Sequence, residues 1–217
     1  MTAAMENRAK ILIVDDHPLL RKGVMQLIDL DDELETVGEA SNGAEGVKLA
    51  LELDPDLILL DLNMHGMDGI DTLKAMRDEG VVARIVIYTV SDNDEDIVTA
   101  IRAGADGYLL KDMEPPKLLE RLKEAAVGKM VVSEKMTEAL ASALRAKPKT
   151  ENISLDSLTS RELQILKLIV EGQSNKLIAR ELDITEGTVK VHVKHLFKKL
   201  KMKSRIEAAV WGVHQGV

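Results

Sequence analysis

The sequence has no cysteine and very few aromatic residues, with one Trp, two Tyr and one Phe among 217 residues. The absence of cysteine excludes a disulfide scaffold and a thiolate site. The scarcity of aromatic rings argues against a stacking surface for single-stranded nucleic acid and leaves aliphatic side chains to form the core. No apolar run reaches the roughly 18 residues of a membrane helix, and the N-terminus lacks a secretory apolar segment. We therefore expect a mature cytoplasmic protein without membrane attachment.

Charge is distributed unevenly along the chain. Residues 1–128 contain 13 Lys and Arg against 27 Asp and Glu, whereas residues 156–217 contain 11 against 7. At roughly 100 to 200 residues per domain, the length fits one large or two modest domains. The asymmetry favours two domains with different partners, a cation for the acidic part and phosphate for the basic part. We therefore expect a first domain over residues 1–128 and a second over residues 156–217.

The segment between these parts, residues 129–155, starts with an Ala- and Leu-rich helical pattern. It then passes into a run of Pro, Lys, Thr, Asn and Ser without apolar periodicity. This composition predicts a linker helix followed by a flexible tether at about residues 145–155.

The acidic part alternates short apolar runs with helical patterns. The runs that predict strands are KILIV (10–14), ETVGEA (35–40), DLILLD (56–61), RIVIYTV (84–90) and GYLLK (107–111). Strands that are apolar on both faces and joined by helices are typical of a parallel sheet covered on both sides. The predicted fold class is therefore α/β, a five-stranded, doubly wound, flavodoxin-like sheet whose site lies at the carboxyl ends of its strands.

Charged and hydroxyl side chains occur at those carboxyl ends. They are Asp15 and Asp16 after the first strand, Asp61 after the third, Thr89 after the fourth and Lys111 after the fifth. Three carboxylates on one edge repel one another unless a hard divalent cation lies among them, and Mg²⁺ prefers carboxylates, waters and phosphate oxygens. A lysine and a hydroxyl can bind added phosphoryl oxygens. The pattern predicts a Mg²⁺ and phosphoryl site.

Each of these residues also has a simpler interpretation. Asp15 and Asp16 could cap the helix that begins near Pro18. His17 and His65 flank the acidic edge and could be Zn²⁺ ligands, although solvated neighbours are the commoner case. A flavin site would require a Ser- or Thr-rich loop after the first strand. A haloacid-type phosphatase would require an aspartate at the position of Asn63.

The motifs VDDHP, LLDLNMHGMDG, YTVSD and GADGYLLKD resemble the receiver domain of bacterial two-component response regulators over about 120 residues. The resemblance implies that Asp61 accepts the phosphoryl group and that Asp15, Asp16, Asp61 and the main-chain carbonyl of Asn63 bind Mg²⁺. It also implies that Thr89 and Tyr108 form the switch pair and that Lys111 binds the phosphoryl group. Two residues depart from the usual receiver pattern. Many receivers have proline at the position of His65 and at the position of Asp112, which follows Lys111.

The basic part is helical throughout. LTSRELQILKLIVEG predicts a helix with Thr159 as N-cap and Glu162 completing a capping box. SNKLIARELDI and TEGTVKVHVKHLFKKLKMKS predict two further helices, the second opened by Thr185 and joined to the first by a short turn. Two helices in this arrangement are typical of a helix-turn-helix, whose second helix enters the major groove of DNA.

The second helix of this pair has one apolar and one basic face. At 100 degrees per residue, one stripe contains Val189, Val193, Leu196, Phe197 and Leu200, and the opposite face carries Lys190, Val191, Lys194, His195, Lys198 and Lys201. A basic face is often simply solvated. Val191 in its middle is better explained by contact with a thymine methyl group.

The segment from Leu158 to Gly212 resembles the LuxR-type helix-turn-helix domain, and its combination with a receiver resembles the NarL/FixJ class. The match is greatest to its nitrate/nitrite-responsive members, which implies control of anaerobic respiratory genes. The resemblance implies that Lys190, Val191 and Lys194 face base edges, that Lys176 and Lys198 contact phosphate, and that SRIEAAVWGVH forms a homodimer contact on DNA. Gly187 departs from the larger residue common in this class.

These resemblances predict a phosphorylation-dependent transcription regulator rather than an enzyme. Its expected partners are a sensor histidine kinase and double-stranded DNA, and its expected cofactor is Mg²⁺. Two alternatives remain at this point. One is an enzyme that hydrolyses a small phosphoester, and the other is a DNA-binding protein that works without phosphate.

Overall fold

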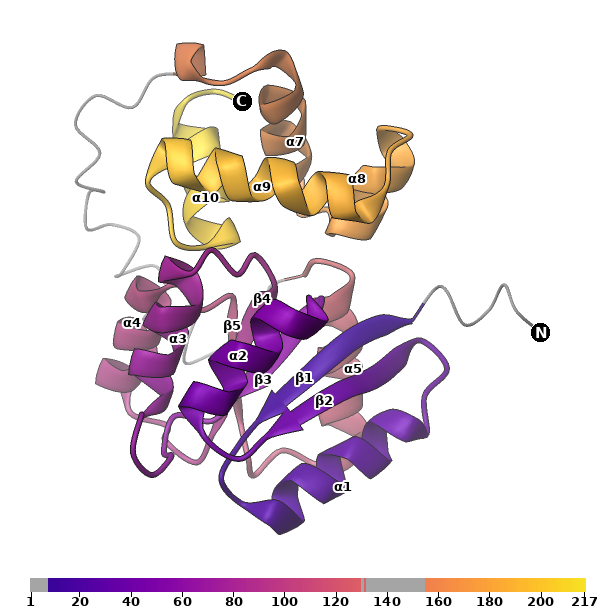
Figure 1. Ribbon diagram of the computed structural model, residues 1–217, viewed down its shortest axis with the longest axis vertical. Helices are drawn as coiled ribbons and strands as arrows, with labels where there is room; N and C mark the ends of the chain where they lie inside the picture. Colours follow the sequence, from indigo (N-terminus) through magenta and orange to yellow (C-terminus); the bar gives the residue numbers. More distant parts are fainter. Residues whose placement is uncertain (1–7, 130, 132–154) are drawn as a thin grey trace.

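The computed structural model describes residues 8–129, 131 and 155–217 (Figure 1). The linker helix and tether expected over 129–155 fall almost entirely outside the described residues. In this segment, Val131 forms an isolated parallel bridge with Gly107.

The first domain contains a parallel sheet of five strands in the order β2-β1-β3-β4-β5. The strands are β1 (Ala9–Val14), β2 (Leu34–Ala40), β3 (Leu57–Leu60), β4 (Arg84–Thr89) and β5 (Gly107–Leu110). Every neighbouring pair is parallel. The expected doubly wound α/β fold is confirmed, with strand ends within a residue or so of the expected ones.

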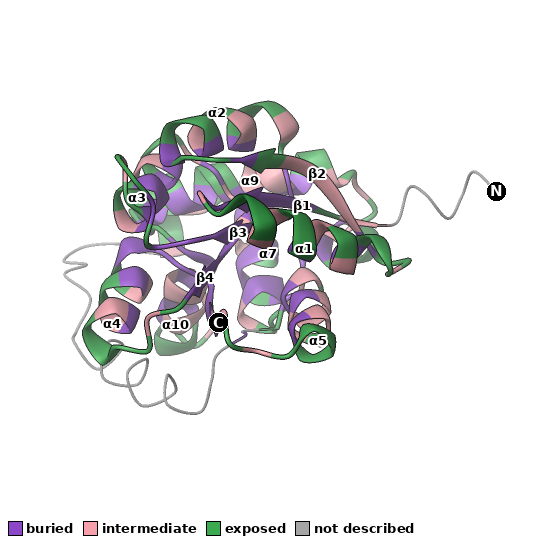
Figure 2. Cartoon of the chain, turned by 90° about the horizontal axis from the view of Figure 1, so that it is seen from below, coloured by how far each residue is buried: buried purple, intermediate pink, exposed green. Residues whose placement is uncertain are grey.

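Five helices cover the two faces of this sheet (Figures 1 and 2). They are α1 (Pro18–Asp29), α2 (Gly43–Leu53), α3 (Gly69–Asp78), α4 (Asp94–Ala103) and α5 (Pro115–Ala126). Helices α1 and α5 pack on one face through Val24, Ile28, Leu118 and Leu122. Helices α2, α3 and α4 pack on the other face through residues such as Leu73, Met76 and Ile97.

The central strand β3 is buried at all four positions because side chains on both of its faces meet helices. Figure 2 shows β1, β3 and β4 as a largely buried layer, whereas the edge strand β2 is partly exposed. This layering fixes the carboxyl ends of β1, β3, β4 and β5 side by side, so residues from four separate segments meet there.

The second domain is a small helical unit with its own core. It contains a short 3-10 turn (Leu155–Ser157), α7 (Ser160–Val170), α8 (Asn175–Glu181), α9 (Glu186–Leu200) and α10 (Arg205–His214). Its core includes Ile165, Ile169 and Trp211 together with the five residues of the apolar stripe predicted on α9. The expected N-caps Thr159 and Thr185 are confirmed, and Thr159 forms a capping box with Glu162.

The second domain lies against the edge of the sheet where the strands begin, with α9 facing the receiver-like domain (Figure 1). The loops before β3 and β4 provide contacts there, since Lys190 of α9 reaches Asp54 and Asp56, and Lys194 reaches the carbonyl of Glu79. Among the described helices, none combines the length and the apolar character that crossing a membrane requires.

Candidate functional site

The predicted acidic site lies at one edge of the sheet, where four parallel strands end. Asp15 and Asp16 follow β1, Asp61 follows β3, Thr89 ends β4 and Lys111 follows β5. Asp15, Asp61 and Thr89 are buried, although their polar groups would be better solvated at the surface. Burial of three polar groups at adjacent strand ends requires compensating partners.

Lys111 supplies part of this compensation. Its Nζ lies 2.8 Å from Asp15 Oδ2 and 2.7 Å from Asp61 Oδ2, and its side chain is almost fully buried. One ammonium group therefore faces two carboxylates. A single positive charge leaves the cluster with an excess of negative charge, which a further cation would neutralise.

The chemistry of the remaining donors fits a hard divalent cation. Asp61 Oδ1 is buried and receives no hydrogen bond from the described residues. Ligand atoms of Asp15, Asp16, His17 and Asp61 all lie within 4.8 Å of one another. Clustered carboxylate oxygens with an unsatisfied buried lone pair are the ligands that Mg²⁺ prefers.

Asp16 is fixed by the loop that follows β3. The His65 backbone N–H donates to Asp16 Oδ2 at 3.0 Å, and His65 Nδ1 lies 2.5 Å from the same oxygen. Burial opposes ionisation of Asp16, but the hydrogen bonds from His65 and the charge of nearby imidazoles outweigh it, so the pKa of Asp16 lies below its ordinary value. The sequence did not indicate this contact, which joins residues far apart in the chain.

Thr89 and Tyr108, the expected switch pair, lie on neighbouring strands. Thr89 Oγ1 accepts a hydrogen bond from the Asn63 side-chain amide at 3.2 Å. Tyr108 is buried, and its hydroxyl donates to the Ser91 carbonyl at 2.9 Å. Burial raises the pKa of Tyr108 to about 12. The Tyr108 ring therefore lies inside the core in this structure.

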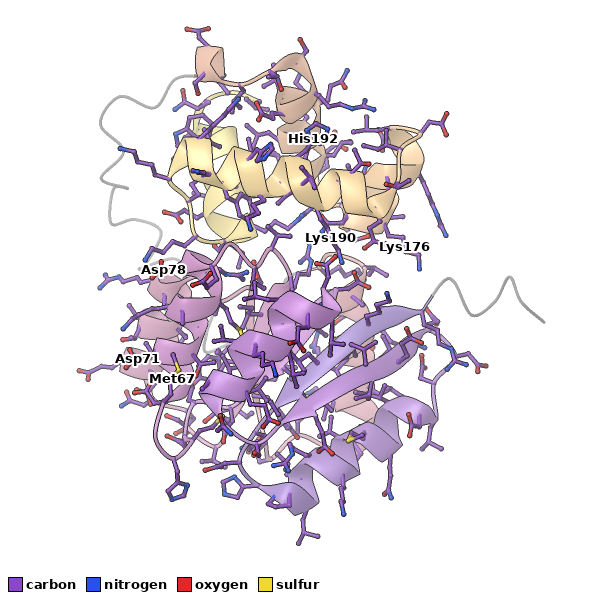
Figure 3. All side chains as sticks on the ribbon, viewed as in Figure 1. Met67, Asp71, Asp78, Lys176, Lys190 and His192 are labelled. Atoms are coloured by element: carbon purple, nitrogen blue, oxygen red, sulfur yellow. The ribbon has the colours of Figure 1, made fainter. Side chains whose placement is uncertain are left out.

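The basic face of α9 contacts the first domain. Lys190 Nζ lies 2.9 Å from the Asp54 carbonyl, 3.1 Å from Asp54 Oδ2 and 3.2 Å from Asp56 Oδ1. Figure 3 shows Lys190 pointing from α9 into the space between the two domains. Burial lowers the pKa of this ammonium, but the nearby Asp56 and Asp54 charges outweigh that effect and raise it.

The other residues predicted to bind DNA are distributed around the same interface. Lys194 Nζ approaches the Glu79 carbonyl at 3.3 Å and, with Lys198, lines a cavity of about 420 Å³ between the domains. Lys176 lines a smaller cavity beside Asp56. Val191 remains 54% exposed, as expected of a residue that the domain core does not explain.

Glu186 makes a contact between the domains that the sequence analysis did not predict. It begins α9 and hydrogen-bonds Asp56 of the first domain. Burial, followed by this hydrogen bond and the Asp56 charge, raises the pKa of Glu186 to about 7. Burial raises the pKa of Asp56. The hydrogen bond with Glu186 and the charge of Lys190 outweigh burial, so the pKa lies below its ordinary value. In the sequence, a glutamate at the first position of a helix indicates only a favourable helix start.

A buried pair beneath the interface was also missed. Arg77 Nη2 donates to Asp106 Oδ2 at 2.6 Å, and both side chains are 3% exposed. Arg77 also donates to the carbonyls of Val81 and Ala83, and the Ile85 N–H donates to Asp106. The pair therefore fixes the loop before β4, which forms part of the interface.

Two family comparisons decide what this arrangement is. Residues 11–123 match the response regulator receiver domain, and residues 156–212 match the bacterial regulatory proteins of the luxR family. The nitrate/nitrite response regulator protein NarL of Escherichia coli K12 is 59% identical over 207 residues, which is 95% of both chains. The chain belongs to the response regulators that carry a LuxR-type DNA-binding domain.

Further relatives agree with this assignment. A nitrate/nitrite response regulator protein homolog of Haemophilus influenzae is 50% identical and covers 95% of this chain and 97% of its own. The crystal structure of the response regulator ChrA has a TM-score of 0.51 at 30% identity and covers 97% of this chain and 98% of that chain. The resemblance to a NarL-type response regulator in the sequence is thereby confirmed. The output of the chain is DNA binding rather than a classical enzyme reaction.

Proposed function

We propose that the receiver takes a phosphoryl group from a phosphohistidine of a sensor kinase onto Asp61, and that this controls DNA binding by the LuxR-type domain. The observation that carries the proposal is the position of Asp61. Its carboxylate is buried between Lys111 and the acidic pair Asp15 and Asp16, with one oxygen that receives no hydrogen bond from the described residues. We propose that the receiver extends over 1–128, a linker over 129–155 and the DNA-binding domain over 156–217.

The proposed transfer forms one bond and breaks one. A carboxylate oxygen of Asp61 attacks the phosphorus atom, the P–N bond to the kinase imidazole breaks, and the electron pair leaves with the imidazole nitrogen. Lys111 Nζ, already 2.7 Å from Asp61 Oδ2, neutralises charge on the phosphoryl oxygens. The Thr89 hydroxyl, at the next strand end, donates a hydrogen bond to the transferred group, and Tyr108 transmits the change.

Mg²⁺, when bound, supplies charge neutralisation to the phosphoryl oxygens. The residues that would hold it are Asp15, Asp16 and Asp61 with the main-chain carbonyl of Asn63. The clustered carboxylate oxygens support this assignment. His65 keeps Asp16 ionised and oriented toward the site through its two contacts to Oδ2.

For DNA, we propose that α9 enters the major groove. Lys190, Val191 and Lys194 would contact base edges, while Lys176 and Lys198 would contact phosphates. Helix α10 would form the homodimer contact on DNA, which matches the two-fold symmetry of regulators of this kind. We also propose a cytoplasmic location, since the proposed DNA and kinase partners would be met there.

The Escherichia coli relative is named a nitrate/nitrite response regulator, and this name supports nitrate or nitrite as the signal for this chain. Identity of 59% across both domains makes the same response the best proposal here. We propose nitrate- or nitrite-responsive control of anaerobic respiratory genes.

The test is phosphorylation of the full chain with acetyl phosphate and Mg²⁺. Wild type should incorporate one base-labile phosphoryl group, and Asp61→Asn should incorporate none, because its amide cannot act as the nucleophile. Asp112→Asn, beside Lys111 but off the acidic edge, is the matched control and should label normally. Full labelling of Asp61→Asn would refute the proposal. Continuous phosphate release from an unactivated phosphoester would instead support the phosphoesterase alternative.

A further inference from the structure

His17 lies among the metal-binding carboxylates. Its Nδ1 is 2.9 Å from Asp16 Oδ1, 3.2 Å from Asp15 Oδ1 and 4.0 Å from Asp61 Oδ2. His17 is also the N-cap residue of α1, and its side chain makes no cap hydrogen bond to that helix. The imidazole is thus held by the carboxylates rather than by its own helix.

These separations suit ligands of one metal ion. Two ligand atoms that are each about 2.1 Å from a metal lie about 3.0 Å apart at a right angle and about 4.2 Å apart on opposite sides. The three separations of His17 Nδ1, from 2.9 to 4.0 Å, are close to that range. A small shift of these side chains would therefore allow His17 Nδ1 and the carboxylate oxygens to bind the same ion.

A second observation points to a ligand at this place. Asp61 is 1% exposed, and its Oδ1 is buried without a hydrogen-bond partner among the described residues. Buried carboxylate oxygens are rarely left without a partner unless an ion or a water satisfies them. Asp61 belongs to the same group of four possible ligand residues as His17.

The second histidine at this edge has a different position. His65 contacts the other oxygen of Asp16, Oδ2, through its backbone N–H and its Nδ1. It does not belong to the group of ligand atoms around Asp61. A group that hydrogen-bonds a metal-binding carboxylate from behind fixes its orientation without binding the ion.

We infer that His17 is an additional metal ligand and that His65 positions Asp16. The receiver would then bind divalent ions of the later first transition series, such as Co²⁺, Ni²⁺ and Zn²⁺, with a nitrogen ligand that Mg²⁺ does not use. The chemical reason is that imidazole suits these ions, whereas Mg²⁺ retains oxygen ligands and water. This inference rests on the proposed cation site at Asp15, Asp16 and Asp61.

The experiment measures Mg²⁺ and Co²⁺ binding to the full chain by calorimetry. Co²⁺ binds carboxylate sites more tightly than Mg²⁺ in any case, so the informative quantity is the ratio of the two affinities in each variant. His17→Ala should reduce Co²⁺ affinity about tenfold or more and Mg²⁺ affinity much less, so the ratio falls. The visible absorption of bound Co²⁺ should change as well, because a nitrogen ligand is replaced by water.

Two control variants separate ligation from proximity. His65→Ala should weaken both ions by a similar factor and leave the ratio unchanged, since it acts only through Asp16. His214→Ala, at the end of α10, should change neither affinity and reports adventitious binding by surface histidines.

An unchanged Co²⁺ affinity and spectrum in His17→Ala would overturn the inference, and so would an equal loss for both ions. Either result leaves the proposed phosphorylation of Asp61 untouched, because that is tested separately by labelling with acetyl phosphate and Mg²⁺. Absence of Mg²⁺ binding in the wild type would instead refute the cation site itself.

Discussion

The lysines proposed to read DNA bases already have partners in the receiver. Lys190 faces the Asp54 and Asp56 carboxylates, and Lys194 faces the Glu79 carbonyl. Carboxylate and carbonyl oxygens offer the same hydrogen-bond acceptors as phosphates and guanine edges. Under the proposed DNA contacts, the receiver would therefore compete with DNA for the same nitrogen atoms.

Lys194 and Lys198 should differ in what their loss does to DNA binding. Lys194→Ala should remove discrimination worth about 1 to 3 kcal/mol at one base position, because it removes a direct base contact. Lys198→Ala should weaken all sequences equally and lower the slope of log affinity against log salt by about one unit. The measurement is titration of specific and mutated sites at several salt concentrations, with the isolated DNA-binding domain to avoid competition. Equal effects of the two variants on specific and non-specific DNA would contradict this division.

At the scale of elements, a single capping box stabilises the start of α7. The Thr159 side chain accepts from the Glu162 N–H, and Glu162 accepts from the Thr159 N–H at 2.8 Å. Glu162 is 3% exposed and also receives Lys199 Nζ of α9 at 2.7 Å. Burial opposes ionisation of Glu162, but these donors outweigh it and lower its pKa. One carboxylate thus joins the start of α7 to α9.

Thr159→Ala should destabilise the DNA-binding domain by about 1 kcal/mol through loss of the cap. The sole Trp of the chain, Trp211, is buried in that domain, so its fluorescence during urea unfolding of the full chain reports that domain alone. Ser160→Ala, at the exposed first position of the same helix, is the control and should change stability by less than about 0.5 kcal/mol. Equal midpoints for wild type and Thr159→Ala would contradict the role of the cap.

Strand β3 connects the two functional surfaces of the receiver. Asp56 precedes it at the domain interface, and Asp61 follows it at the proposed phosphorylation site. At about 3.3 Å per residue, the strand separates these carboxylates by roughly 17 Å. Phosphate on Asp61 therefore cannot touch α9, and its effect must pass through β3, β4 and the loops that begin them.

At the scale of the whole molecule, an acidic domain covers the basic helix of a second domain in the same chain. We expect this arrangement to mask α9 until phosphorylation opens it. The segment between the domains keeps them at high effective concentration, so even a weak contact suffices. Phosphorylation opens the interface only to the extent that the phosphoryl group favours the open state.

The comparison that tests masking uses the fragment 150–217 and the full chain, each with and without acetyl phosphate, on one specific DNA site. The fragment should bind constitutively, and the full chain should approach its affinity only when phosphorylated. Asp56→Asn should raise the affinity of the unphosphorylated full chain, because it weakens the contact with Lys190. If the unphosphorylated full chain binds as tightly as the fragment, phosphorylation acts through dimerisation alone.

Masking should also depend on pH, through Glu186. Its pKa is about 7 in the closed arrangement and close to the ordinary 4.5 once the domains separate. The closed state binds more protons, so the contribution of Glu186 to closure is fully present below about pH 4.5 and is lost as the pH rises through about 7. Within pH 6 to 8, the unphosphorylated full chain should bind DNA less well, relative to the fragment, as the pH falls.

Glu186→Gln removes this titrating group and is the matched control for the pH experiment. Its ratio of full-chain to fragment affinity should vary little between pH 6 and 8, whereas that of the wild type should rise. The fragment corrects for His192 and His195, which lie on α9 in both molecules. A wild-type ratio that is constant with pH would show that Glu186 does not contribute to closure.

The sequence alone predicted the parallel sheet, the order of elements and the members of the acidic site. It could do so because these depend on local patterns: apolar runs of strand length, caps such as Thr159, and the rule that parallel strands end at one edge. The buried stripe on α9 followed from helical periodicity for the same reason. The family motifs added roles to residues that the pattern had already brought together.

Only the tertiary structure showed that His65 contacts Asp16, that Arg77 pairs with Asp106, and that Glu186 and Lys190 meet Asp56. The partners in these pairs are separated by between 29 and 134 positions in the chain. No local periodicity encodes such pairs, because they arise from the packing of whole elements. The same holds for Tyr108, which is buried in a cluster with residues of other elements such as Ile97 rather than with its own neighbours in sequence.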